Sequence, residues 1–261
     1  MLLYSQPLDL LPLWALFILT ALILFLAAEV GFYLGKSIQK RWPDKSESSV
    51  GTIVGASLAL LGFLLAFVTS IAIGVFNERR QLVIAEANAI GTTYLRAGYL
   101  SEPYGMESRQ LLREYVNLRL EAIDPAKTEA AISRSEQIQD ELWVRAEKIA
   151  RDSPVPTVAL YITSLNEVID IHTERLNAEM GFRVPPTVML ALYGVAVMTL
   201  FLLGVHDSYK GSRNMVALIS VVLVISLVIF IIADLDRSNV GLIKVPQKAL
   251  LDLQAKLNTM P

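Results

Sequence analysis

The amino-acid sequence predicts an all-α integral membrane protein with four transmembrane helices and an extramembrane helical domain inserted between the second and third of them. Three observations predict this class: four long apolar segments, a content of charged residues of only 18%, and a polar middle without strand-like alternation. An average soluble domain has about 25% charged residues. The composition therefore excludes a single soluble globule, a disordered chain and a disulfide scaffold.

The four apolar segments are each long enough to cross a bilayer, which takes roughly 20 residues in a helix. They cover residues 11–34, 50–76, 186–205 and 215–233. None alternates with the period of two that a barrel strand requires. No Lys or Arg precedes the first segment, and its apolar stretch is longer than that of a signal peptide, so we expect it to stay as a membrane anchor.

The polar middle is expected to be helical. No Gly or Pro lies between Val75 and Ala89, so the second span should continue as one helix over 50–96, roughly 70 Å long at 1.5 Å per residue. Apolar residues at helical spacing predict three further helices, around 111–122, 132–149 and 160–176, and a short amphipathic helix after Pro246. The expected organisation is an N-terminal transmembrane hairpin (1–76), a helical domain (77–185), a C-terminal transmembrane hairpin (186–233) and an amphipathic tail (234–261).

The distribution of basic residues gives two orientations. The short loops after the first and third spans hold six basic residues, so the positive-inside rule places these loops in the cytoplasm and both termini outside. Seven basic residues flank the membrane on the other side, which favours the reverse. The six are Lys36, Lys40, Arg41, Lys45, Lys210 and Arg213, and the seven are Arg79, Arg80, Arg175, Arg183, Arg237, Lys244 and Lys248.

The second span carries small residues at four-residue spacing. Helix backbones approach each other closely in lipid where such residues face a neighbour, so one interpretation is helix packing. The other is that this stripe lines a central path in an oligomer, with the hydroxyls of Thr69 and Ser70 offered to a passing ion. The stripe consists of two rows, Gly51, Gly55 and Ala59 in the first and Gly62, Ala66, Ser70 and Gly74 in the second.

Charged residues stand at two further places near the predicted membrane. Glu29 lies about two-thirds along the first span, where a carboxylate faces either the bundle interior or the interface. At the opposite membrane face, Glu78, Arg79 and Arg80 follow the second span. Asp234, Asp236 and Arg237 follow the fourth. We expect Arg79 or Arg80 to pair with Asp234 or Asp236 in a charged collar; the alternative is a set of solvated interfacial anchors.

Motifs for catalysis and for metal or cofactor binding are absent from the sequence. It holds no nucleophile elbow, Walker loop, dinucleotide-binding glycine pattern or zinc signature. The absence of cysteine excludes thiolate catalysis and cysteine-ligated metals. His172 has Asp170 and Glu174 two residues away on either side, an offset that points the side chains to different helix faces. We therefore predict no enzyme, no cofactor and no metal. The net charge of −2 gives no reason to expect nucleic acid as a partner.

Three stretches of the chain resemble a known pattern: LLGFLLAF (60–67), FNERRQLVIAEANAIGTTYLRA (76–97) and DRSNVGLIKVPQKALLDL (236–253). They resemble the bacterial and plant membrane proteins of the bestrophin-like domain family, most specifically at Arg79, Arg80, Glu86, Asn88, Tyr94 and Arg96. The resemblance implies kinship to bestrophins, which are pentameric anion channels with four spans and a helical region between spans two and three. It implies that this region and both termini are cytosolic.

Two bestrophin features are not found as local motifs, the aromatic pore neck and the acidic calcium clasp, so anion selectivity and calcium gating are not carried over. The resemblance and the small-residue stripe together predict a homo-oligomer, a pentamer by analogy, that forms a channel-like pore for small ions in a bacterial inner membrane. Its expected partners are the lipid bilayer and further copies of the chain. The alternative is a membrane-anchored scaffold or sensor whose helical domain binds a protein partner.

Overall fold

The computed structural model describes all residues except 1–10, 42–46, 182, 211–212, 238–240 and 261, and only the backbone of 47–49 and Met180. Lys45 of the first loop and part of the stretch 236–253 therefore lie outside the described residues. Every regular element in the described part is a helix. The chain divides into two compact units, which we call the membrane unit (1–76 and 183–243) and the polar unit (77–182 and 244–261). The predicted tail, 234–261, is shared between them.

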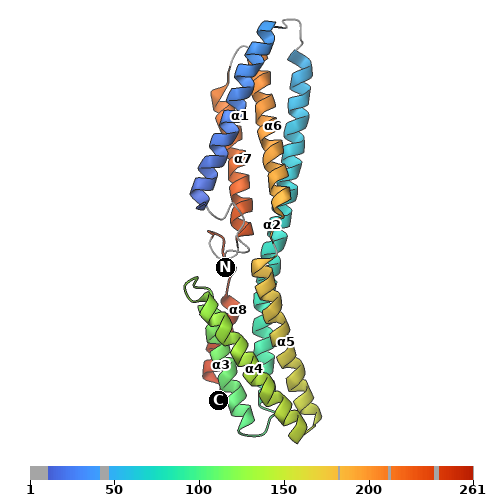
Figure 1. Cartoon of the computed structure of the whole chain (residues 1–261), viewed down its shortest axis with the longest axis vertical. Helices are drawn as coiled ribbons and strands as arrows, with labels where there is room; N and C mark the ends of the chain where they lie inside the picture. The colour runs from blue at the N-terminus through green and yellow to red at the C-terminus, as the bar shows by residue number, and fades with distance from the viewer. Residues whose placement is uncertain (1–10, 42–46, 182, 211–212, 238–240, 261) are drawn as a thin grey trace. The chain divides into compact units, whose positions relative to one another are not determined.

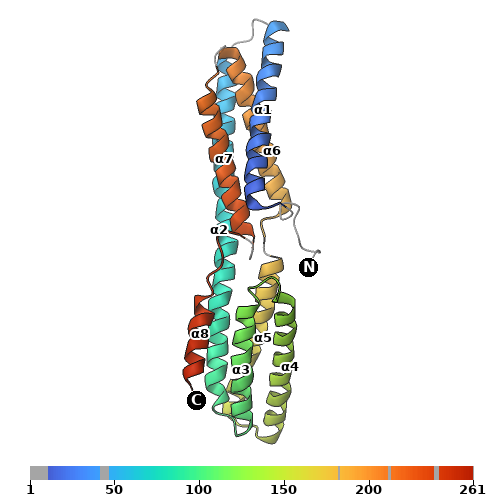
Figure 2. The same cartoon turned by 90° about the vertical axis from the view of Figure 1, so that its left-hand side faces the viewer.

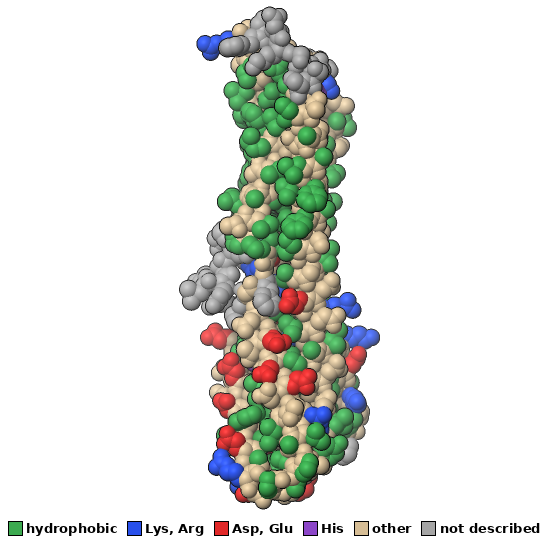
Figure 3. Space-filling model, turned by 90° about the vertical axis from the view of Figure 1, so that its right-hand side faces the viewer, with side chains coloured by type: hydrophobic (Ala, Val, Ile, Leu, Met, Phe, Trp, Pro, Cys, Tyr) green, Lys and Arg blue, Asp and Glu red, His purple; other side chains and the backbone are tan. Residues whose placement is uncertain are grey.

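The membrane unit contains the four helices that are long and apolar enough to cross a membrane. These are α1 (Leu13–Arg41), α2 (Glu47–Ala97) up to Phe76, α6 (Pro186–Lys210) and α7 (Met215–Asp236). They run side by side in both views (Figures 1 and 2). On the face of this unit that Figure 3 shows, hydrophobic side chains are spread along the surface between its two ends. The four predicted spans are confirmed as apolar helices of spanning length.

Helices α1 and α6 approach each other at glycine. A Cβ atom added to Gly31 would lie 2.0 Å from the carbonyl oxygen of Phe201, and one added to Gly204 would lie 1.9 Å from that of Ala28. No side chain fits at such distances, so the two backbones touch. Helix association in lipid depends on this kind of packing because the surrounding acyl chains are as apolar as the side chains.

The polar unit consists of the rest of α2 with α3 (Tyr104–Glu121), α4 (Thr128–Asp152), α5 (Pro156–Met180) and α8 (Lys248–Thr259). The amphipathic stripes of these helices meet in one core, which includes the buried rings of Tyr94, Tyr115 and Tyr161. Leu250 and Leu257 of α8 are buried in the same core, and Leu253 lies against Gly91 of α2. Charged side chains of this unit lie on the face that Figure 3 shows.

The helix ends follow local chemistry. Helix α2 runs unbroken from Glu47 to Ala97, as the absence of Gly and Pro around its middle predicts, and ends before Gly98. Helix α5 begins with a proline, whose missing N–H is not needed in a first turn, and ends at Met180. The N–H of Gly181 donates to the carbonyl of Asn177 and closes its last turn.

Candidate functional site

The small-residue stripe of α2 lies on the face of this helix that is exposed in the single chain. The opposite face is buried in the core of the membrane unit through Val54, Leu61, Val68 and Ala72. Gly51 is half-buried, and a Cβ atom added to it would lie 3.0 Å from the ring of His206. The other members of the stripe are exposed, and Thr69 beside them is half-buried. The hydroxyl of Thr69 donates to the carbonyl of Leu65 within the helix, at 2.7 Å, which leaves Ser70 as the exposed hydroxyl.

Three glycines of this stripe differ from Gly31 and Gly204 of α1 and α6. A Cβ atom added to Gly55, Gly62 or Gly74 would meet no described atom within 4 Å. Apart from Gly51, the stripe therefore contributes nothing to packing inside the described part of the chain. Its surface is open to another molecule or to solvent.

Two aromatic rings stand on the same exposed side of α2. Phe63 is 66% exposed and Phe67 is 54% exposed, and their rings stack with centroids 6.3 Å apart. Large aromatic side chains and small residues therefore share this exposed side of α2. The signal for this pair in the sequence was the four-residue spacing of the two phenylalanines within LLGFLLAF, and it was missed.

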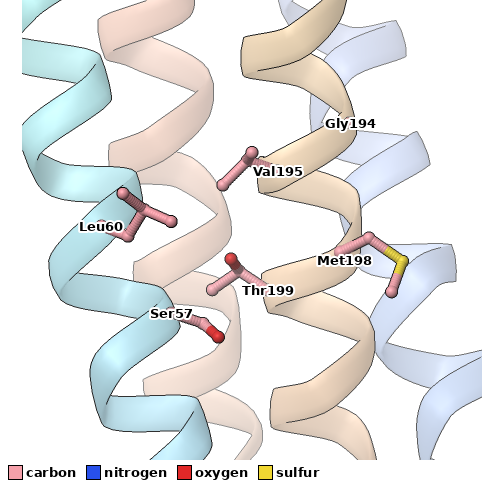
Figure 4. Close-up of a pocket in the computed structure, with 6 residues that line it drawn as sticks. All are labelled: Ser57, Leu60, Gly194, Val195, Met198 and Thr199. Atoms are coloured by element: carbon pink, nitrogen blue, oxygen red, sulfur yellow. The ribbon is translucent and has the colours of Figure 1, made fainter.

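A groove of about 240 Å³ lies beside this face, between α2 and α6 (Figure 4). Its lining residues are Ser57, Leu60, Gly194, Val195, Met198 and Thr199. The side chains of Ser57 and Thr199 point into the gap between the two helices. None of the six residues is charged, so the groove suits an acyl chain or an apolar side chain rather than an ion.

Glu29 forms an ion pair inside the membrane unit. Its carboxylate accepts a hydrogen bond from the guanidinium of Arg213, just before α7. The same guanidinium lies over the ring of Phe32, 3.9 Å from its centroid. Arg213 belongs to the loop between α6 and α7. Whether Glu29 faces the bundle interior or the membrane interface stays a prediction.

The acidic residues at the end of α7 bind within the membrane unit. Asp236 accepts from the guanidinium of Arg183 at 2.7 Å and from the backbone N–H of Val184 at 2.7 Å. Asp234 accepts from the N–H groups of Leu242 and Ile243. These bonds fasten the chain segments that enter α6 and leave α7.

Two basic members of the predicted collar, Arg79 and Arg237, bind backbone carbonyl groups. Arg237 donates to the carbonyl of Leu11 at 2.7 Å. Arg79, buried in the polar unit, donates to the carbonyl of Ala178, whereas Glu78 and Arg80 are exposed. The pairing of Arg79 or Arg80 with Asp234 or Asp236 stays a prediction.

Four further residues at which the family resemblance is most specific lie in the polar unit. Glu86 is fully buried and joins a cluster of charged and polar side chains. Tyr94 is buried and accepts a hydrogen bond from Arg113, and Arg96 donates to the carbonyl of Leu160. Asn88 is exposed. Three of these four residues therefore bind elements of the polar unit together.

The cluster around Glu86 draws one or two side chains from each of four helices. Arg119 of α3 donates to one carboxylate oxygen of Glu86 at 2.9 Å, and Arg175 of α5 donates to the other. Tyr115 of α3 bridges to His172 of α5 at 3.0 Å and accepts from Gln139 of α4 at 3.0 Å. All six side chains are less than 10% exposed.

Charge interactions set the protonation of this cluster. Burial raises the pKa of Glu86, but the guanidiniums of Arg175 and Arg119 outweigh burial and hold the pKa below its ordinary value of 4.5. Burial, with the repulsion of Arg119, lowers the pKa of His172 from 6.5 to about 4. Burial also raises the pKa of Tyr115. At neutral pH the cluster therefore holds an ionised Glu86, a neutral imidazole and a neutral phenol.

Comparisons with known proteins agree with this architecture. Residues 12–250 match the family model of the Bestrophin-like domain. No curated protein matches the chain. A crystal structure of a membrane protein with a proline-to-alanine substitution is 13% identical to the chain, with a TM-score of 0.63, over 94% of this chain and 97% of that one. A bacterial bestrophin homologue from Klebsiella pneumoniae with an isoleucine-to-threonine mutation is 13% identical, with a TM-score of 0.61, over 92% and 97%. At these identities the likeness shows a shared fold.

Proposed function

Because the chain belongs to the bestrophin-like family, we propose that it forms a homo-oligomeric, channel-like pore for small ions in a bacterial inner membrane. The observation that carries this proposal is the exposed small-residue face of α2, which the described part of the chain does not cover. A monomer gains nothing from such a face. Several copies arranged around a common axis would enclose a path with it.

The composition of the face suits a passage for ions. Backbone at Gly62 and Gly74 and the hydroxyl of Ser70 offer polar groups without fixed charge. Phe63 and Phe67 would narrow the path, because their exposed rings are the largest groups on this side of α2 in the membrane unit. Apolar constrictions in channels gate by excluding water.

The polar unit lies outside the bilayer in this proposal. Its helices α3 and α4 carry charged residues along their surfaces, as in the pairs of Arg134 with Glu114 and Glu141. Charged side chains facing lipid would be costly, so a helical bundle with this surface belongs in water. By analogy with bestrophins, five copies form the assembly.

The absence of cysteine allows a direct test of the path. Ser70→Cys introduces a single thiol on the exposed face of α2. We expect a charged, membrane-impermeant thiol reagent to label it and to reduce the current of the reconstituted protein in planar bilayers. Val224→Cys on α7, where Val224 is 62% exposed on the surface of the membrane unit, is the matched control and should resist labelling because it faces lipid.

Assembly is tested separately from conduction. Gly62→Leu places a bulky side chain on the open face and should lower the subunit number in native mass spectrometry, whereas Val224→Phe on α7 should leave it unchanged. If the reconstituted protein shows no conductance in any salt or at any pH, the proposal of a pore is wrong. An oligomer that forms without conducting, and a soluble partner bound in stoichiometric amount, would favour the scaffold or sensor instead.

A further inference from the structure

The groove between α2 and α6 separates two helices of the membrane unit that are long and apolar enough to span a bilayer. It has a volume of about 240 Å³, and the side chains of Ser57 and Thr199 point into the gap (Figure 4). If this gap were empty, the atoms that line it would lose dispersion contacts. Acyl chains surround spanning helices in a bilayer, so an acyl chain is the group available to fill the groove.

The seam between α2 and α6 continues beyond the groove to His206. Thr199 and His206 are seven residues apart, which places them on one face of α6 and about 10 Å apart along its axis. Gly51 of α2 lies opposite His206, because a Cβ atom added to this glycine would be 3.0 Å from Cε1 of the imidazole. The apolar part of α6 ends at Val205. His206 therefore marks the end of the seam at which lipid headgroups would lie.

The imidazole of His206 has a nitrogen to offer to another molecule. Its Nδ1 is buried and has no hydrogen-bond partner among the described residues. The residue as a whole is half-buried, so Nε2 is the ring nitrogen that a ligand can reach. Unpartnered buried N–H groups are rarer than unpartnered buried acceptors. This favours the tautomer with the proton on Nε2, which makes that nitrogen a donor.

A cation stands one turn beyond His206 on the same face of α6. Lys210 is the last residue of this helix and is exposed. Spacings of three, four and seven residues keep side chains on one face of a helix, so Thr199, His206 and Lys210 form one row. The acid next to His206, Asp207, lies about 100° away around the helix axis. The row therefore leads from an uncharged groove to a donor and then to a positive charge.

We propose that the seam between α2 and α6 binds one membrane phospholipid. One acyl chain fills the groove, and the phosphate accepts hydrogen bonds from Nε2 of His206 and from the ammonium of Lys210. A free phosphate would leave the groove empty, and an apolar side chain of a second copy would leave His206 without an acceptor. A phospholipid uses both halves of the seam. The site lies within the membrane unit and does not depend on conduction.

Native mass spectrometry of the full-length protein in detergent tests the site. During titration with dioleoyl phosphatidylglycerol, each chain should retain one lipid before further lipids bind. Dioleoylglycerol has the same acyl chains without the phosphate, and glycerol phosphate has no acyl chains. Each of these two probes lacks one half of the ligand and should bind at least about tenfold more weakly, a difference of about 1.4 kcal/mol.

Two variants test the two halves separately. Ser57→Phe fills the groove and should weaken the retention of phosphatidylglycerol about tenfold. Ser220→Phe, at an exposed position of α7, is the matched control and should retain the lipid as the wild type does. His206→Phe keeps a ring beside Gly51 but removes the donor. It should lower the affinity for phosphatidylglycerol and leave that for dioleoylglycerol unchanged, a difference that a merely structural change would not produce.

Crosslinking locates the bound chain without any substitution. Phosphatidylglycerol with a diazirine in one acyl chain, supplied at one lipid per chain, should crosslink to peptides from α2 and α6. This measurement decides even where Ser57→Phe fails to fold. Crosslinks confined to α1 or α7 would overturn the proposal.

Equal retention of the three probes, or wild-type retention by folded Ser57→Phe, would also contradict a phospholipid in this seam. A structure of the assembly with a side chain of a neighbouring copy in the groove would do the same. None of these results depends on currents, so a failure of the lipid site and a failure of the proposed pore are distinguishable.

Discussion

The membrane unit and the polar unit are stabilised by different interiors. Between its ends, the core of the membrane unit is apolar, and its tightest contacts join the backbones of α1 and α6 at Gly31 and Gly204. The core of the polar unit surrounds ionised side chains, with Glu86 between two guanidiniums. Lipid supplies no hydrophobic force between helices, so the core of the membrane unit depends on how closely the shapes of its helices fit together. If the polar unit lies in water, as we propose, the hydrophobic effect stabilises its core, and this core can then accommodate a buried charge cluster.

Within the membrane unit, two faces that contain glycine also differ in what they contact. Gly31 of α1 and Gly204 of α6 touch a neighbouring backbone, whereas Gly55, Gly62 and Gly74 of α2 touch nothing described. Both faces have small residues at four-residue spacing. The spacing therefore predicts that something can approach closely, and the structure decides whether this is the chain itself.

The largest effect should come from filling the contact between α1 and α6. Gly204→Leu would force a side chain against the carbonyl of Ala28, and a backbone cannot move aside as a flexible side chain does. We expect a loss of at least about 3 kcal/mol of stability and little folded protein in size-exclusion chromatography of detergent extracts. Gly194→Leu on the same helix, where an added Cβ meets nothing described within 4 Å, should elute as the wild type does. Equal yields of the two variants would contradict backbone contact as the basis of this interior.

Glu86→Gln should have the largest effect in the polar unit. The substitution keeps the shape of the side chain but leaves Arg119 and Arg175 buried without their common acid, which should cost about 3–5 kcal/mol. Denaturant unfolding followed by Trp143 fluorescence measures this loss. Glu114→Gln, which breaks an ion pair at the surface between α3 and α4, is the control and should unfold with the wild type. A neutral outcome for Glu86→Gln would mean that the interior of the polar unit tolerates an uncompensated pair of cations.

Acid should destabilise the polar unit through His172. The pKa of this imidazole is about 4 in the folded chain and 6.5 when unfolded, chiefly because of burial. The contribution of His172 to the free energy of unfolding is fully present above pH 6.5. It is lost as the pH falls toward 4, and the loss reaches about 3 kcal/mol. The lowered pKa of Glu86 adds a loss in the same direction below 4.5. His172→Phe should flatten the dependence between pH 6.5 and 4 and keep the part below it; an unchanged pH profile would contradict the neutral, buried imidazole.

Hydropathy and helix punctuation predicted most of the fold. The four spans, the continuous α2 and the helices of the polar unit follow from local patterns, since each depends on residues within a few turns. The contact between α1 and α6 could not be predicted from a local pattern, although Gly31 and Gly35 have the same spacing as the stripe on α2. Which of two similar faces finds a partner depends on residues some 170 positions apart.

The buried cluster could not be predicted for the same reason. His172 was judged from Asp170 and Glu174 beside it, but its partner is Tyr115, 57 residues away. Glu86 was known only as part of a family resemblance, and Arg119 and Arg175 look like ordinary surface residues of amphipathic helices. The available signal for the cluster was the four-residue spacing of Tyr115 and Arg119, which places two polar side chains on one face of an amphipathic helix.

The smallest expected effect concerns the one described side-chain hydrogen bond between α1 and α6. The hydroxyls of Thr20 and Tyr193 lie 2.8 Å apart, and such bonds between membrane helices average about 0.6 kcal/mol because the separated helices find other partners. A double-mutant cycle with Thr20→Val and Tyr193→Phe should give a coupling of this size, with Tyr33→Phe at an exposed site of α1 as the control. A coupling as large as the effect of Gly204→Leu would show that polar contacts, rather than backbone shape, hold this interior together. The two units would then be stabilised by the same kind of interaction.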